Sequence, residues 1–416
     1  MNNHKENCQI HIVGAGVSGL IAAQLLESHG HSPIIFEADH RAGGRLKTDI
    51  INGYQLDHGF QVLLTAYPMA QKYLDYEQLE LQKFLPGASV FFNNKKLTIG
   101  DPTRETSLLL PTLMANLGRF SDKIKILQLN HALRKKTLDQ IFNEEEKSTL
   151  AYLRGYGFSN DIIQMFFRPF FSGIFLEPEL QTSSRMFEFV FKMFGSGWAA
   201  LPKSGIEAIP KQLVKKLNGT TFKFNTPVKQ VEDGRLILSN GEVYENHYSI
   251  IATDANHLVR NLNYLKSKWH GCDNLYFETS KRQIKKPLIG LVSDPDALIN
   301  NIFYHTSLQT ASSSPKELLS VTVVKPHNYN LDELRLKVEQ DLEQYCGIKG
   351  CQFIKHYPIE KALPQLDDLK NEMLPSQTKL TDKIFLAGDQ LLNGSLNAAI
   401  ISGERAAMGI IEKQNI

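Results

Sequence analysis

Three glycines near the N-terminus have the spacing of a binding site for a phosphate-bearing ligand. Gly14, Gly16 and Gly19 follow an apolar stretch at residues 10–13 and open a second apolar stretch that reaches Gly30. In a strand–turn–helix unit, the first glycine permits the tight turn, the second lets the backbone approach a pyrophosphate, and the third lets the helix pack closely on the strand. The free N–H groups and positive dipole end of the helix favour phosphates. The run therefore predicts a dinucleotide site rather than a glycine-rich turn without a ligand.

Carboxylates near both ends of the chain could hold the rest of such a ligand. Glu37 ends the next apolar stretch, 18 residues after Gly19, and can accept hydrogen bonds from ribose hydroxyls while repelling a 2′-phosphate. Near the C-terminus, Asp389 follows the apolar stretch at residues 383–387, and Ser395 provides an N-cap for the alanine-rich helix expected after it. These residues predict a dinucleotide ligand, but the glycine fingerprint alone does not separate NAD from FAD.

Together these segments resemble the flavin-containing amine oxidase and phytoene desaturase superfamily, over most of the chain. The resemblance implies an FAD cofactor, with Glu37 on the ribose, Arg45 near the pyrophosphate and Val228 at the adenine. It also implies that Asp389 binds the pyrophosphate or the ribityl chain, and that Leu396 approaches the flavin ring. The implied cofactor-binding residues are Gly14, Ala15, Gly16, Ser18, Gly19, Glu37, Ala38, Gly43, Gly44, Arg45, Gly59, Val228, Gly388, Asp389, Ser395 and Leu396.

His58 lies in a segment, Asp57–Gly59, that the family often places near the flavin. It is open whether this residue contacts the flavin or is an ordinary loop histidine. No cysteine lies near the C-terminal motif, which excludes a thioether bond between that part of the chain and the flavin. We therefore expect non-covalent FAD.

The predicted fold class is α/β, with a Rossmann-like FAD-binding domain and a discontinuous α+β substrate domain. We expect residues 1–80, 200–262 and 375–416 to form the FAD-binding domain, with a parallel sheet and a β-meander. Turns at Asp233-Gly234 and Asn240-Gly241 predict the meander strands at 228–232, 236–239 and 242–245. Residues 81–199 and 263–374 form the expected substrate domain, with a hairpin that turns at Asn93-Asn94, strands at 275–279, 288–292 and 319–324, and a helix over 331–345.

Phenylalanines gather between residues 166 and 194. A helix is expected there, beginning after Ser183 or Ser184 and ending at Gly195. Its aromatic face could line a channel for a long apolar substrate, or it could simply fill a helical core. The candidate substrate-contacting residues are Phe170, Phe171, Phe187, Phe191 and Trp198.

Composition excludes several classes of function. The formal net charge is +2 with no long run of one sign, which gives no electrostatic footprint for nucleic acid. Four scattered cysteines argue against a disulfide framework and favour a reducing, cytoplasmic location. No metal-ligand spacing, signal-peptide core or membrane-spanning stretch is present. The basic helix expected over 121–137 could present a solvated face or rest on the inner face of a membrane.

The activity expected from the resemblance is removal of hydride from a C–H bond of an apolar, isoprenoid-like substrate. Amine oxidases of the family usually carry an aromatic residue just before the C-terminal flavin helix, whereas this chain has Gln390–Asn393 there. The stretch at 56–64 also looks closer to the desaturase-like branch. A flavin amine oxidase, a redox-neutral flavin-dependent isomerase and a non-catalytic flavoprotein remain alternatives. No catalytic acid or base can be named, and the oligomeric state and electron acceptor are left open.

Overall fold

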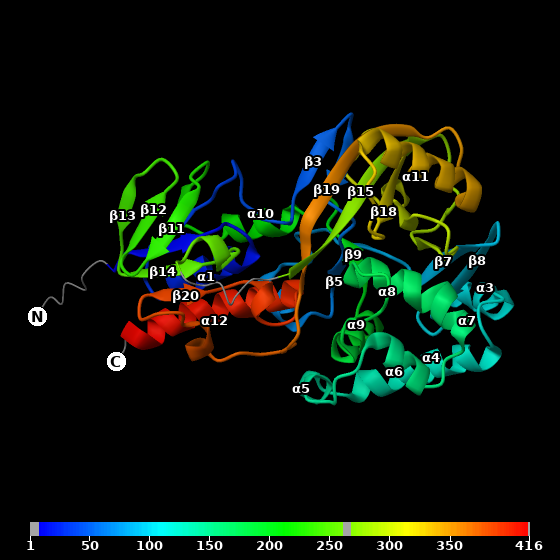
Figure 1. The fold of residues 1–416 in the computed structure, drawn as a ribbon, viewed down its shortest axis with the longest axis horizontal. Coiled ribbons are helices and arrows are strands. Elements are labelled where there is room, and N and C mark those ends of the chain that lie inside the picture. The colour runs from blue at the N-terminus through cyan, green and yellow to red at the C-terminus, as the bar shows by residue number, and fades with distance from the viewer. Residues whose placement is uncertain (1–7, 261–267, 415–416) are drawn as a thin grey trace, which may run out of the picture.

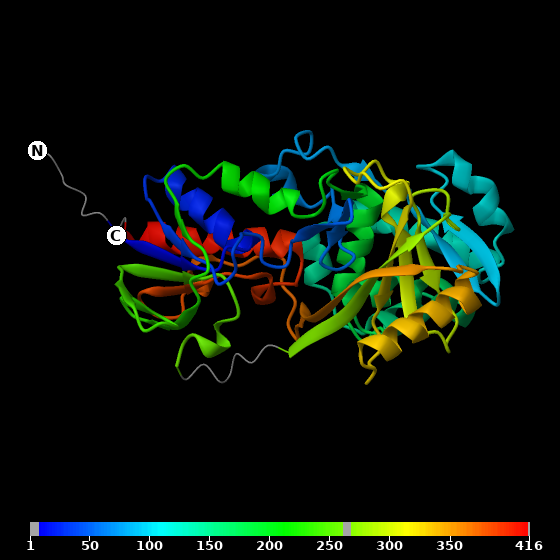
Figure 2. The ribbon, with the colours of Figure 1, turned by 90° about the horizontal axis from the view of Figure 1, so that it is seen from above.

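The computed structural model describes residues 8–260 and 268–414, which form two lobes side by side along the long axis (Figures 1 and 2). One lobe is built on a parallel sheet with the strand order β10-β2-β1-β14-β20. Its strands come from three separate stretches of the chain: β1 (Ile10–Val13), β2 (Ile34–Phe36), β10 (Thr221–Lys223), β14 (Tyr248–Ile251) and β20 (Ile384–Leu386).

The alternation of side chains along β1 explains how this sheet is covered on both faces. Ile10 and Ile12 point into the core that contains the helices α1 (Val17–Ser28), α10 (Ala208–Lys215) and α12 (Leu396–Gln414). Val13 points into a smaller core against the meander of β11 (Val228–Glu232), β12 (Arg235–Leu238) and β13 (Val243–Glu245). A Cβ at Gly403 would lie 2.2 Å from the carbonyl oxygen of Ser18. The helices α1 and α12 are therefore in backbone contact.

The second lobe contains a mixed sheet with the strand order β19-β15-β18-β17-β16-β7-β8. One face is covered by α11 (Leu331–Cys346), and α8 (Arg168–Phe175) packs against β16 and β17. The strands are β7 (Gly87–Phe92), β8 (Lys95–Gly100), β15 (Lys268–Thr279), β16 (Ile289–Val292), β17 (Ile299–Tyr304), β18 (Glu317–Val323) and β19 (Gln352–Gln365).

A helical segment lies beside this sheet, at the end of the molecule away from both labelled termini (Figure 1). Its helices are α3 (Leu109–Met114), α4 (Phe120–Lys135), α5 (Leu138–Phe142), α6 (Thr149–Gly155), α7 (Asn160–Ile162), a π-helical turn at Ile163–Phe167 that runs into α8, and α9 (Ser184–Ser196). Short strands and one helix connect the two lobes: β3 (Thr48–Ile51), β4 (Tyr54–Asp57), β5 (Leu63–Leu64), α2 (Pro68–Tyr73), β6 (Gln82–Lys83) and β9 (Ala199–Leu201).

The predicted fold class is confirmed, since a parallel Rossmann-like sheet with a meander and a separate mixed sheet are both present. The hairpin turn is also confirmed, because Asn93 and Asn94 have the left-handed φ values of 48° and 57° that a tight hairpin requires. The predicted end of α9 is wrong: the helix continues through Gly195 and is capped by Gly197. The predicted domain boundary at 262–263 and the predicted polar start at residues 1–7 lie outside the described residues.

Candidate cofactor and substrate cavity

A cavity of about 1000 Å³ runs from the glycine-rich turn at α1 into the helical segment of the second lobe. Its lining includes Gly14 and Gly16 of the first turn and Gly44 of the second. Gly14 has φ +104°, and a Cβ there would lie 2.9 Å from the carbonyl oxygen of Ala252, so this turn requires glycine. At Gly16 the nearest atom to an added Cβ is the Cα of Gly44, 4.0 Å away. The two turns thus face each other with bare backbone.

Glu37 supports the same turn from the end of β2. Its carboxylate accepts hydrogen bonds from the backbone N–H of Ala15 at 2.7 Å and of Asp39 at 2.9 Å. Glu37 also lines the cavity. No side chain caps the first turn of α1, whose N-cap is Gly16. The helix therefore presents backbone N–H groups next to a cavity-facing carboxylate, which suits a phosphate and a ribose respectively.

The C-terminal motif reaches the same cavity from the opposite end of the chain. Arg45 forms an ion pair with the buried carboxylate of Asp389, and the other side of its guanidinium group donates to the carbonyl oxygen of Ala362 at 3.0 Å. Ser395 accepts a hydrogen bond from the Ala398 N–H at 3.0 Å and so caps α12, as the sequence predicts. Leu396, the first residue of α12, lines the cavity.

Most of the predicted cofactor-binding residues lie on this cavity. The lining includes Gly14, Gly16, Ser18, Glu37, Gly43, Gly44, Arg45, Gly59, Gly388, Asp389, Ser395 and Leu396. Ala15, Gly19, Ala38 and Val228 are not among the lining residues. Gly19 instead allows α1 to pack on the turn, because a Cβ there would lie 2.1 Å from the carbonyl oxygen of Gly14. Ala38 is exposed, and Val228 packs in the core of the meander.

The predicted aromatic wall divides into two groups. Phe170, Phe191 and Trp198 line the cavity, together with Phe166 and Phe194. Phe171 and Phe187 do not, because both are completely buried in the main hydrophobic core. These two residues fill the helical core, which was the alternative expectation, and they do not line the cavity.

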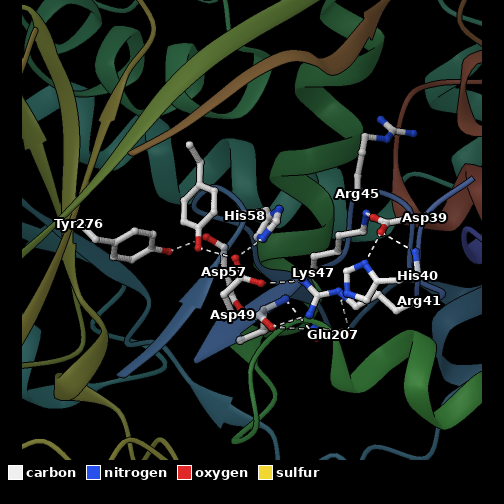
Figure 3. A network of polar contacts seen from close by, with 12 residues as sticks. Asp39, His40, Arg41, Arg45, Lys47, Asp49, Asp57, His58, Glu207 and Tyr276 are labelled. Carbon is white, nitrogen blue, oxygen red and sulfur yellow. Dashed lines mark hydrogen bonds and ion pairs between the residues drawn. The ribbon is translucent and has the colours of Figure 1, made fainter. Parts of the chain in front are cut away.

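A polar network connects the cavity to the second sheet (Figure 3). Asp49 receives hydrogen bonds from Arg41 at 2.7 Å and from the hydroxyl of Tyr357 at 2.8 Å. Nε2 of His58 lies 2.9 Å from Oδ2 of the same Asp49 carboxylate. The ring of His58 lies 4.4 Å from that of Tyr357, and both residues line the cavity. His58 is therefore held in place rather than free in a loop.

The carboxylates near this network have contrasting proton affinities. Burial opposes ionisation of Asp49, but its bonds to Arg41 and Tyr357 lower its pKa to about 2. The Lys47 ammonium group likewise lowers the pKa of Asp39 to about 2. Asp57 is completely buried, and desolvation raises its pKa to about 6 even though Thr48 and the Ile206 N–H donate to it.

Several cavity residues were not identified from the sequence. Tyr357, Trp269 and Cys272 come from β15 and β19, and the sequence carries no motif that places them there. Burial raises the pKa of the Cys272 thiol to about 12, so this cysteine stays protonated near neutral pH. In the helical segment, Arg104 donates to the carbonyl oxygens of Phe194 at 2.7 Å and Gly197 at 2.6 Å, and its guanidinium lies 4.3 Å from the Trp198 ring centre.

Comparison with known proteins identifies the family. The profile for flavin-containing amine oxidoreductases matches residues 17–411. The chain belongs to this family. It is 22% identical to protoporphyrinogen oxidase 2 of Arabidopsis thaliana over 476 aligned positions, which cover 96% of this chain and 93% of that protein. It is 27% identical to the L-amino-acid oxidase BmooLAAO-I of Bothrops moojeni, over 53% of this chain and 47% of that enzyme.

Solved structures of family members share the fold. A putative protoporphyrinogen oxidase from Exiguobacterium sp. 255-15 superposes with a TM-score of 0.71 at 18% identity, covering 98% of this chain and all of that one. Wild-type putrescine oxidase bound to putrescine superposes with a TM-score of 0.72 at 15% identity, covering 97% and 99% of the two chains. These structures show a shared fold, while the family profile over residues 17–411 makes the chain an FAD-dependent oxidoreductase of the flavin-containing amine oxidoreductase family.

In the part of the chain that the structure describes, no helix is long and apolar enough to cross a membrane. Within the same residues, no cluster of histidine, cysteine or carboxylate side chains could hold a metal ion. All four cysteines are free thiols.

Proposed function

We propose that this protein removes hydride from a C–H bond of a large apolar substrate, using non-covalently bound FAD. The observation that carries the proposal is the cavity, which is continuous from the glycine-rich turn to a half lined by aromatic and aliphatic side chains. Phe60, Phe84, Phe170, Phe191 and Phe194 all contribute to that half. A linear isoprenoid is the substrate class that fits such a lining best.

The residues around the glycine turns fit FAD. The pyrophosphate would lie against the bare backbone of Gly16 and Gly44, at the uncapped start of α1, with Glu37 on the ribose and Arg45 and Asp389 nearby. Leu396 and the start of α12 would lie at the flavin ring. When bound, FAD supplies the hydride acceptor, so the chain's own task is to hold the substrate C–H in place and exclude water. The apolar lining serves both purposes.

The lining of the apolar half also bears on the alternative substrate, an amine. A protonated amine needs an anion or an aromatic cage close to the flavin. Among the described residues that line the helical half, Asp101 is the one carboxylate, and it already accepts hydrogen bonds from Thr103 at 2.5 Å and from Asn130 at 3.3 Å. Together with the absence of an aromatic residue from Gln390–Asn393, directly before α12, this arrangement favours an apolar substrate over an amine.

A second candidate is an apolar substrate that carries carboxylates, of which a reduced tetrapyrrole is an example. Two cations, Arg104 and Lys123, also line this largely apolar half of the cavity and could bind carboxylates. The Arabidopsis relative, which aligns with almost the whole chain, is named for protoporphyrinogen oxidation. This specific combination makes a tetrapyrrole worth testing beside the isoprenoid.

The test is anaerobic bleaching of the flavin's visible absorbance by polyisoprenoids in detergent, by protoporphyrinogen and by amines, each added separately. We expect bleaching by an isoprenoid. Bleaching by protoporphyrinogen alone would select the second candidate. Bleaching by an amine alone would contradict an apolar substrate while leaving the family assignment intact. Acid precipitation tests the cofactor linkage, because colour that stays in the protein pellet would contradict non-covalent binding.

A further inference from the structure

The helices α3 and α4 carry a large apolar surface that no part of the described chain covers. Met114 is 81% exposed, Leu110 67% and Phe120 65%. Leu109, Leu113, Ile124 and Leu127, on the same two helices, are each more than two-fifths exposed. We call this set of seven side chains the α3–α4 patch. A group of exposed apolar side chains on two successive helices is typical of an interaction site.

The helix α4 has two apolar faces. Leu129 and Leu133 are buried and belong to the main core, where α4 packs on α9. Phe120, Ile124 and Leu127 follow a spacing of four and three residues, which places them together on the opposite side of the helix. The inner face packs α4 on the core, whereas the outer face carries side chains that are largely exposed.

Positive charge surrounds the α3–α4 patch. Residues 109–135 contain five cations, Arg119, Lys123, Lys125, Arg134 and Lys135, and a single acid, Asp122. Asp122 is buried and accepts hydrogen bonds from Ser159 and from the Arg119 N–H. Within the described residues none of the five cations forms an ion pair; Lys123, for example, donates to the carbonyl oxygen of Ala115 at 2.7 Å. An apolar face with a basic border matches the surface of an anionic bilayer.

The same patch forms the mouth of the cavity. Leu109, Leu113, Phe120, Ile124 and Leu127 are exposed, and all five also line the cavity. The cavity therefore reaches the surface between α3 and α4, at the end of the molecule away from the parallel sheet (Figure 1). A second copy of the chain is a poorer occupant, because two identical patches facing each other would bring basic borders together.

We propose that the α3–α4 patch docks the protein on an anionic lipid bilayer, with the cavity mouth opening into the acyl layer. The seven side chains of the α3–α4 patch then lie among the lipid chains, and the cations beside the patch lie at the headgroups. The proposed bilayer contact depends only on the exposed side chains and cations described above. Direct entry of a substrate from the bilayer depends, in addition, on the proposed function.

The test measures sedimentation of the full protein with vesicles made of equal parts phosphatidylcholine and phosphatidylglycerol, without any substrate. The test variant combines Leu110→Ser and Met114→Ser, two residues that do not line the cavity. We expect it to bind the vesicles at least about tenfold more weakly than the natural protein, because two exposed side chains no longer insert into the bilayer. Added salt and pure phosphatidylcholine vesicles should also weaken binding of the natural protein.

The matched control combines Leu336→Ser in α11 and Leu374→Ser in the segment before β20, which remove two apolar side chains of 51% and 65% exposure outside the patch. This variant should bind vesicles as the natural protein does. The proposal is overturned if the natural protein does not sediment with anionic vesicles, or if both double variants behave alike. It is also overturned if the patch variant binds vesicles normally but turns a dimer into a monomer in the ultracentrifuge. Flavin absorbance retained by both variants shows that the fold is intact. Because no substrate is added, the vesicle-binding result does not depend on the proposed function.

Discussion

At the scale of single residues, Gly14 and Gly16 differ in what a side chain would meet. A Cβ at Gly14 would press on the Ala252 carbonyl oxygen at 2.9 Å in a backbone with φ +104°, so a substitution there should damage the fold itself. At Gly16 the nearest atom is 4.0 Å away, on the facing turn. Gly16 is therefore the position at which cofactor binding can be tested separately from folding.

We expect Gly16→Val to leave a folded protein that retains at least about tenfold less FAD, because a branched side chain would occupy the space beside the turn where a pyrophosphate must approach. The measurement is the ratio of flavin to protein absorbance after desalting. Gly155→Val in α6 is the control, since a Cβ there meets nothing within 4 Å. A Gly16→Val protein that keeps its yellow colour would show that the cofactor site has been misplaced.

Asp57 predicts a pH dependence of stability. Burial raises its pKa from 3.8 to about 6, so the folded state holds a proton that the unfolded state loses across this interval. The contribution of Asp57 to stability is therefore fully present below about pH 4 and is lost as the pH rises to about 6. The buried histidines His11 and His305, whose pKa values fall to about 4, act with the opposite sign over an overlapping range.

We expect Asp57→Asn to gain about 2 kcal/mol of unfolding free energy relative to the natural protein between pH 4 and pH 6, because the variant has no buried carboxyl group to ionise. Urea unfolding of both proteins at the two pH values measures this difference, and the histidine contributions cancel in the comparison. A difference that stays constant with pH would contradict the raised pKa.

At the scale of elements, α9 carries two phenylalanines with different roles one turn apart. Phe187 is completely buried, whereas Phe191 is partly buried and lines the cavity. We expect Phe187→Ala to lower stability by about 3–5 kcal/mol, because it leaves a cavity in a packed core. Phe191→Ala should cost less stability, keep FAD and slow flavin bleaching by an apolar substrate. Thermal unfolding and anaerobic bleaching of both variants test this prediction. Equal losses of stability in the two variants would contradict a core role for Phe187 and a cavity role for Phe191.

The same helix shows where sequence-based prediction succeeds and where it ends. Its position followed from a serine cap and an apolar period, and the hairpin and meander followed from their Asn and Gly turns. The sequence could not predict which residues of α9 line the cavity. Phe187 and Phe191 lie on one face of the helix, and only the neighbours that pack on them distinguish the two. Strands β17 and β19 were missed because polar residues and two prolines, Pro358 and Pro364, interrupt their apolar pattern.

The cofactor site shows a similar division. The glycines, Glu37 and Asp389 were found because each belongs to a local motif whose chemistry is tied to its spacing. Tyr357 and Cys272 lie on long strands of the other lobe, and their approach to the cavity depends on how the two lobes pack. The basic helix α4 was named from the sequence as one that could rest on a membrane, but α3 was not. The sequence also did not separate exposed Ile124 and Leu127 from buried Leu129 and Leu133, since an apolar position on a helix does not reveal whether it faces the core or the solvent.

At the scale of the whole molecule, the cavity joins three distant stretches of chain. Gly16, Thr253 and Asp389 all line it, and they come from the beginning, the middle and the end of the sequence. A ligand in this cavity bridges the three stretches and binds only the folded state. Cofactor binding should therefore stabilise the parallel-sheet lobe as a unit.

We expect FAD to raise the unfolding free energy of the flavin-free protein by about 4 kcal/mol at a thousand times its dissociation constant. Thermal unfolding of deflavinated protein with and without FAD measures this effect. Riboflavin, which lacks the ADP half, is the control and should stabilise much less, because it cannot reach the glycine turns or Glu37. Equal stabilisation by both compounds would contradict a dinucleotide site at α1.

The backbone contact between α1 and α12 has a consequence for synthesis. Residues 17–28 are made several hundred residues before α12, the helix that packs on them, and Gly388, Asp389 and Leu396 are made just before or with α12. The apolar face of α1 therefore lacks this partner in the nascent chain until α12 has been synthesised. Cofactor capture should follow the synthesis of α12, and a chain released before α12 should not hold flavin.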